Sequence, residues 1–205
     1  MYFIARWQPE VAADNGCWPV FDRGALEQAR AYIDQANKQR DPSSHPTVQG
    51  YLLLNEARIF YAFCMSLPDT DDEYEASCAR FENATKALTD LYAEQRTSAL
   101  APLVATAYAM HGDIAYLNAD DRGAIALYEQ ALATDQSDLY QNVQVSGYLG
   151  DSYYQLGQLD KAAQAYDRAS ALAGKIPRPD WEADFAAARD SVDEQLQTSS
   201  ITVTP

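Results

Sequence analysis

Hydrophobic residues along this chain recur at the three- to four-residue spacing of amphipathic helices, and no segment sustains the alternation of a strand. Leu26, Ile33 and Ala36 lie on one face of an expected helix that Asp22 caps. Between about 47 and 67 apolar residues occur on all sides, as expected of a helix packed on two faces. The pattern predicts eight helices, at about 22–40, 47–67, 71–95, near 102 to 118, 121–134, 138–156, 158–173 and 180–197.

The remaining segments suggest how the chain is organised around these helices. Residues 1–20 hold prolines, a glycine and several aromatics without a helical period, and we expect an irregular packed arm. Residues 21–198 are expected to form one helical domain, in which short loops make consecutive helices antiparallel neighbours. The helix at 180–197 alternates charged and alanine positions and has the composition of a cap on a helical stack. Residues 199–205 are expected to be a flexible tail.

A phrase of glycine, aspartate and tyrosine occurs twice in the second half of the chain. It reads Gly-Asp-Ile-Ala-Tyr at 112–116 and Gly-Asp-Ser-Tyr-Tyr at 150–154. Eight residues beyond each tyrosine an A-x3-Y-x2-A phrase begins, at 124 and at 162. The second unit therefore repeats the first at an offset of 38 residues (162 − 124). A period of this length is typical of helical repeat arrays. The small residues are expected to let paired helices approach closely, and the tyrosines of the second phrase are expected to fill the core.

These phrases resemble the tetratricopeptide repeat, whose signature is L-G-x2-Y followed by A-x3-F/Y and a terminal proline. The resemblance is specific over 100–173 and loose over 47–95, where the second phrase is displaced to Ser77, Phe81 and Ala84. Gln136 stands where the first unit should have its proline, so that helix end must be set another way. The resemblance implies an all-α fold, a right-handed α-α superhelix (solenoid) of antiparallel helix pairs with a C-terminal capping helix.

The same resemblance implies a non-catalytic module that binds a partner peptide or protein segment in the concave groove of the stack. In the family, the positions of the repeated aspartate and tyrosine on each first helix line that groove. The candidate partner-binding residues are therefore Asp113, Tyr116, Asp151 and Tyr154, with Arg58 and Tyr61 as a looser third pair. The alternative for these positions is that they follow the family pattern and are merely solvated. Family members that clamp a C-terminal carboxylate use basic residues and asparagine here, so the aspartates argue against such a clamp.

Two other functions remain open from the sequence. The chain could be a structural or assembly domain that makes contacts through its ends or convex face, including self-association. It could also be a chaperone for a single client, as its size, acidity and repeat type resemble acidic repeat-built chaperones of bacterial secretion systems.

The charge of the chain narrows the class of partner. The formal net charge is −15, which repels phosphate backbones and anionic lipid surfaces. We therefore expect no nucleic acid partner. The acidity permits a basic or amphipathic protein partner, and the alternative is that it only keeps the protein soluble. No run approaches the roughly 18 apolar residues of a transmembrane helix, so membrane insertion is not expected.

Catalytic and metal-binding motifs are not found in the sequence, and we expect neither an enzyme nor a cofactor. His45 and His111 are expected at helix edges, as surface or capping residues. The acidic run at 69–75 lacks the glycine of a calcium loop, which favours a helix-start cap over a metal site.

The three cysteines, Cys17, Cys64 and Cys78, include no C-x-x-C pair. Cys64 and Cys78 are expected about four residues out of step across a helical hairpin, with Cα atoms beyond the roughly 7 Å limit of a disulfide. Free thiols favour a reducing compartment, so a cytoplasmic location is expected.

Overall fold

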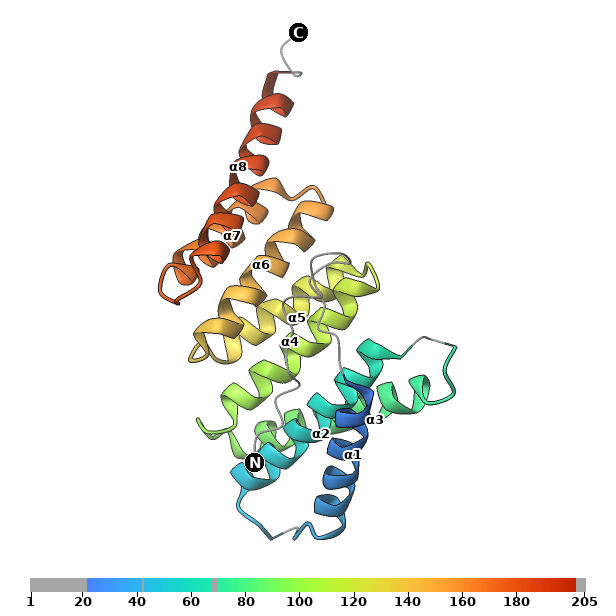
Figure 1. The fold of residues 1–205 in the computed structure, drawn as a ribbon. Coiled ribbons are helices and arrows are strands. Elements are labelled where there is room, and N and C mark those ends of the chain that lie inside the picture. Colours follow the sequence, from blue (N-terminus) through green and yellow to red (C-terminus); the bar gives the residue numbers. More distant parts are fainter. Residues whose placement is uncertain (1–21, 42, 68–69, 202–205) are drawn as a thin grey trace. The chain divides into compact units, whose positions relative to one another are not determined.

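The computed structural model describes residues 22–41, 43–67 and 70–201, and over these residues the chain is all α-helical, without a strand (Figure 1). This confirms the predicted all-α class, whereas the arm expected at 1–20 lies outside the described residues. The helices are α1 (Arg23–Lys38), α2 (Pro46–Ser66), α3 (Tyr74–Gln95), α4 (Ala101–Leu117), α5 (Asp121–Thr134), α6 (Leu139–Gln155), α7 (Leu159–Ala173) and α8 (Pro179–Ile201). Helix α8 continues past its expected end at 197, so the tail expected from 199 begins inside a helix.

Helices α1, α2, α5 and α6 each begin after a side chain that accepts a hydrogen bond from a free backbone N–H group of the first turn. Asp22 accepts from the amides of Gly24 and Ala25 at 2.8 and 3.2 Å, as the sequence predicted. Asp120 and Asp138 cap α5 and α6 in the same way. His45 precedes the proline that opens α2 and accepts from the Thr47 amide at 3.3 Å, which confirms it as a capping residue.

The chain divides into two compact units, one ending at Leu103 and the other beginning at Val104. In the first unit α2 packs against both α1 and α3. Its apolar residues are accordingly buried on both sides, with Leu54, Phe60 and Phe63 at most 2% exposed. The all-round apolar pattern of this segment therefore has the predicted cause.

A disulfide joins α2 to α3 in the first unit, which overturns the prediction of free thiols. Cys64 and Cys78 are bonded, and their Cα atoms are 5.3 Å apart. Helix α3 begins at Tyr74 rather than at 71, so Cys78 comes four residues into α3 while Cys64 comes two residues before the end of α2. The two cysteines are thus nearly level across the hairpin, and the cysteine argument for a reducing compartment no longer holds.

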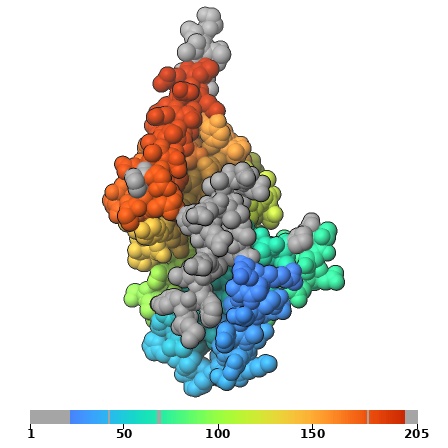
Figure 2. All heavy atoms as spheres, viewed as in Figure 1, coloured from blue at the N-terminus to red at the C-terminus, as the bar shows by residue number. Residues whose placement is uncertain are grey.

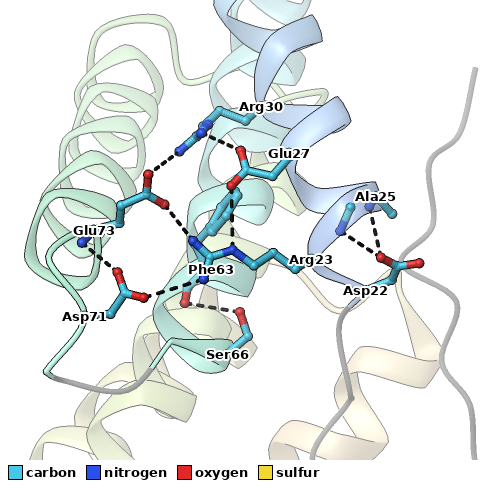
Figure 3. Close-up of polar contacts among 10 residues, drawn as sticks. Asp22, Arg23, Ala25, Glu27, Arg30, Phe63, Ser66, Asp71 and Glu73 are labelled. Atoms are coloured by element: carbon cyan, nitrogen blue, oxygen red, sulfur yellow. Dashed lines mark hydrogen bonds and ion pairs between the residues drawn. The ribbon is translucent and has the colours of Figure 1, made fainter.

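The acidic run before α3 contacts α1 through ion pairs (Figure 3). Arg23 lies 3.5 Å from Asp71 and 3.2 Å from Glu73, and Arg30 lies 3.5 Å from Glu73. Asp71 also accepts a hydrogen bond from the Glu73 amide. The expected acidic helix start is therefore found in part: Glu75 lies in the first turn of α3, and Glu73 takes the N-cap position without a side-chain cap hydrogen bond, whereas Asp71 precedes both.

In the second unit, two glycines form seats for tyrosine rings of the following helix. A Cβ added to Gly112 on α4 would lie 2.5 Å from the Tyr128 ring on α5, and one added to Gly150 on α6 would lie 2.6 Å from the Tyr166 ring on α7. Both rings are buried, at 0% and 5% exposure, which confirms their predicted place in the core. The alanines of the second phrase are at most 1% exposed: Ala124, Ala131, Ala162 and Ala169.

The turn between paired helices also recurs at the offset of the sequence phrases. Ala119 and Gly157 are separated by that same offset (157 − 119), and both have left-handed backbones, with φ of 56° and 68°. In each turn this residue and the next donate to helix carbonyls three and five residues earlier, the pattern of a Schellman motif. Gln136 stands where the repeat signature has a proline after the second helix. Its side chain donates to the Leu132 carbonyl at 2.8 Å and so satisfies a free carbonyl at the end of α5.

Helix α8 packs on α7 (Figures 1 and 2) and also reaches α6 through single side chains. The Phe185 ring takes the space over Gly147 of α6, where an added Cβ would lie 2.4 Å from it. Val192 is 1% exposed in the same core cluster. Phe185 and Val192 therefore belong to the face by which α8 docks on the unit.

The glycine seats predict the sign of a substitution. Helix propensity alone would make Gly150→Ala stabilising by about 1 kcal/mol. Because the new methyl group would meet the Tyr166 ring, we expect the free energy of unfolding to fall by about 1–3 kcal/mol. Denaturant unfolding measures this, with Gly174→Ala as the control, since its Cβ would lie at an ordinary 3.4 Å from Glu182. If Gly150→Ala is as stable as the wild type or more stable, the close contact between Gly150 and the Tyr166 ring is contradicted.

Candidate functional site

The candidate site lies in the second unit, where the tyrosines and aspartates of α4 and α6 meet α7 and α8. Asp113 and Tyr116 are three residues apart on α4, and Asp151 and Tyr154 have the same spacing on α6, so each pair shares one side of its helix. All four side chains are half-buried rather than fully solvated.

Asp151 accepts hydrogen bonds from tyrosines of two other helices. The Tyr166 hydroxyl of α7 donates to Oδ1 at 2.6 Å, and the Tyr116 hydroxyl of α4 makes a longer contact of 3.5 Å with Oδ2. The Tyr116 ring is placed by Tyr148 of α6, with ring centroids 5.5 Å apart. One carboxylate of α6 thus joins α7, the next helix, to α4.

An open pocket of about 330 Å³ lies around this carboxylate. We call it the tyrosine pocket, and its wall is made of Tyr116, Asp151, Tyr154, Gln155, Tyr166, Ala188 and Ser191. The last two residues belong to α8, which therefore forms one side of the pocket. The Gln195 amide, also on α8, donates to the Tyr154 hydroxyl and fixes that ring.

The electrostatics of the tyrosine pocket follow from its partial desolvation. Burial raises the pKa of the Asp151 carboxyl above its usual value, while the Tyr166 and Tyr116 hydroxyls oppose that rise by donating to the ionised form. Burial, and then the charge of Asp151, raises the pKa of Tyr116 to about 12. Burial and the hydrogen bond to Asp151 also raise the pKa of Tyr166. In the described part of the chain, no lysine or arginine forms an ion pair with Asp151.

The six predicted partner-binding residues are not all brought together. Tyr116, Asp151 and Tyr154 share the tyrosine pocket. Asp113 instead accepts from the Tyr128 hydroxyl at 2.8 Å and is not part of the pocket wall. Arg58 and Tyr61 belong to the other unit, where Arg58 is exposed and the Tyr61 ring lies 5.8 Å from the Phe81 ring.

Four residues of the pocket wall were not among the candidates from the sequence. Tyr166 was assigned to the core, which is correct for its ring, but its hydroxyl reaches Asp151. Gln155, Ala188 and Ser191 carry no motif of their own. One available signal was the repeat offset, because Ala188 follows Gly150 at that same offset (188 − 150).

Metal sites and membrane-spanning helices are not found over the described residues. No group of three or more histidine, cysteine, aspartate or glutamate side chains there is placed to hold a metal ion. None of the helices in this part of the chain combines the length and the apolar character needed to cross a membrane.

The burial and hydrogen bonds of two tyrosines predict how stability depends on alkaline pH. The pKa values of Tyr116 and Tyr153 are each raised to about 12; for Tyr153 the cause is burial and then its hydrogen bond to Glu129. A raised tyrosine pKa contributes stability that is complete below pH about 10 and lost as the pH rises toward about 12. Tyrosinate absorbance should therefore show a late group that ionises together with helix unfolding. Tyr153→Phe should remove one tyrosine from that group, and ionisation of all tyrosines in a single step near pH 10 with the helices intact would contradict it.

Comparison with known proteins adds no family to these observations. No protein-family model matches the chain, and no curated protein matches its sequence. Its function has to be inferred from its own residues and contacts.

Proposed function

We propose that this chain is a non-catalytic protein-interaction module of the tetratricopeptide type, and that it binds a segment of a partner protein at the tyrosine pocket. The observation that carries the proposal is that three structural features recur at the same residue offset as the sequence phrases. These are the glycine seat under a tyrosine ring, the hydrogen bond from that tyrosine to the aspartate after the glycine, and the left-handed turn between the helices.

The recurrence supports a stack of similar helix pairs rather than an unrelated helical bundle. Each pair would have the same internal distance and angle, because the same small residue, ring and carboxylate set its approach. Helix α8 would follow as the cap, since Phe185 comes after the glycine it covers at the same offset (185 − 147). In such a stack, α4 and α6 would each be the first helix of a pair, and these first helices would line a common groove, as the sequence resemblance implies.

The pocket itself suits protein recognition. Tyrosine rings offer rigid apolar area at low entropic cost, together with a hydroxyl that bonds to the partner. Tyr116 and Tyr154 are already held in position by Tyr148 and Gln195, so a ligand would not need to order them. The volume is at the lower end of the range for ligand pockets, which suits a side chain of a partner rather than a large free ligand.

One observation favours assembly through another surface as a second candidate function. Val48 and Tyr51 are three residues apart on α2, on one side of the helix, and are 60% and 54% exposed. Neighbouring exposed apolar side chains of this size are found in contacts between proteins. This face would serve self-association of the chain.

A peptide selection tests the interaction function. Segments displayed from a library are selected on the wild-type chain, and the affinities of the synthetic peptides are measured by calorimetry. Ser191→Trp, on the exposed side of α8, should block the pocket and weaken binding by about tenfold or more, since a lost anchor commonly costs about 1.4 kcal/mol or more. Ala186→Trp, exposed on the same helix but outside the pocket wall, is the matched control and should bind normally.

Other outcomes of the selection would contradict the proposal. If no peptide is enriched, binding of an extended segment is wrong. If peptides bind Ser191→Trp normally but lose affinity for the combined variant Val48→Ser and Tyr51→Ser, the exposed face of α2 is the site and the assembly function replaces the one proposed.

A further inference from the structure

The carboxylate of Asp151 is the feature of the tyrosine pocket that points to a particular ligand. Two tyrosine hydroxyls use part of its capacity, but an ionised carboxylate accepts about four hydrogen bonds. The group is half-buried, and no cation is paired with it among the described residues. A desolvated anion without a counter-ion is unfavourable, so the pocket is complementary to a positive charge.

At two other places in the chain, a carboxylate close to an aromatic ring is paired with an arginine of the chain itself. Arg80 lies over the Phe60 ring at 3.9 Å while it pairs with Glu56 at 2.6 Å. Arg30 lies over the Phe63 ring at 5.4 Å and pairs with Glu73 (Figure 3). In both places a guanidinium is held between an aromatic face and a carboxylate. The tyrosine pocket has the rings and the carboxylate.

We propose that the tyrosine pocket binds the cationic head of a lysine or arginine side chain supplied by the partner, between the tyrosine rings and the Asp151 carboxylate. This rests on the proposed function and names the chemistry of the residue that the pocket selects. The negative faces of the rings attract a cation, and the carboxylate forms a charge-assisted hydrogen bond with it. An anion is repelled by Asp151, and an apolar side chain leaves that carboxylate desolvated and unpaired.

The bound cation also relieves the cost that burial places on Asp151. The charged form is disfavoured in the free pocket, as the raised pKa of this carboxyl indicates, and a neighbouring positive charge favours it. An ammonium and a guanidinium share this chemistry. A guanidinium can in addition stack on a ring and bind the carboxylate through two N–H groups, so it is expected to be the tighter of the two.

Small probes test the pocket without any partner. Butylguanidinium and butylammonium chloride are titrated into the full chain and followed by two-dimensional NMR, with sodium chloride at equal ionic strength and neutral butanol as references. Both cations should shift the signals of α4, α6 and α8 residues around the pocket in a saturable way, butylguanidinium at lower concentration. Butanol and sodium chloride should not do so.

Two aspartates in equivalent positions provide a matched pair of variants. Asp151→Asn keeps the size of the side chain and an acceptor for Tyr166 but removes the charge, so it should weaken the cations by on the order of tenfold to a hundredfold. Asp113→Asn makes the same change beside Tyr128, outside the pocket wall, and should leave the affinity of the cations unchanged. Ser191→Trp keeps both carboxylates and should abolish the saturable shifts.

The results separate this inference from the proposed function. Saturation by butanol equal to that of the cations, or equal effects of the two asparagine variants, would overturn the cation site. Absence of any saturable shift at millimolar cation would overturn it as well. In these cases selected peptides that still bind the wild-type chain, without a basic residue at a fixed position, would leave the interaction function standing. If the cations bind but the selection enriches no peptide, the cation site stands and the proposed interaction function is contradicted.

Discussion

The second unit depends on one interaction, a tyrosine hydroxyl bonded to a carboxylate beside a glycine on the preceding helix. The glycine lets the ring approach, and the bond sets its final position: Tyr128 on Asp113 at 2.8 Å, and Tyr166 on Asp151 at 2.6 Å. Without the bond, a buried phenol would leave its hydroxyl unsatisfied. Without the glycine, the ring could not lie over the helix. The pairing of α4 with α5 and of α6 with α7 follows from these two conditions together.

The tyrosine pocket is a consequence of the same interaction. Asp151 differs from Asp113 because its second oxygen contacts Tyr116 of α4. Helix α8 forms one side of the pocket around this carboxylate. A residue that holds the core therefore also presents charge to the outside. This double role explains why we propose the pocket as the binding site, and why substitutions at Asp151 must be compared with the same substitutions at Asp113.

The sequence predicted the helices, the Asp22 and His45 caps and the buried phrases well, because each depends on local patterns such as Asp22 before a helix or Ala162, Tyr166 and Ala169 on one face. It could not predict which side chains meet across helices. Asp113 and Asp151 occupy the same place in the phrase, yet only Asp151 lines the pocket. The disulfide was missed because α3 starts three residues late, after a turn whose acidic side chains pair with Arg23.

Double-mutant cycles for the two tyrosine–aspartate pairs measure this interaction most directly. The free energy of unfolding is determined for Asp151→Ala, Tyr166→Phe and the double variant, and for Asp113→Ala, Tyr128→Phe and their double variant. A hydrogen bond to a charged group predicts a coupling of about 1.5–3 kcal/mol in both cycles, of similar size because the contacts are alike. Additivity within about 0.5 kcal/mol in either cycle would show that the bond does not hold that helix pair, and would contradict a shared construction of the two pairs.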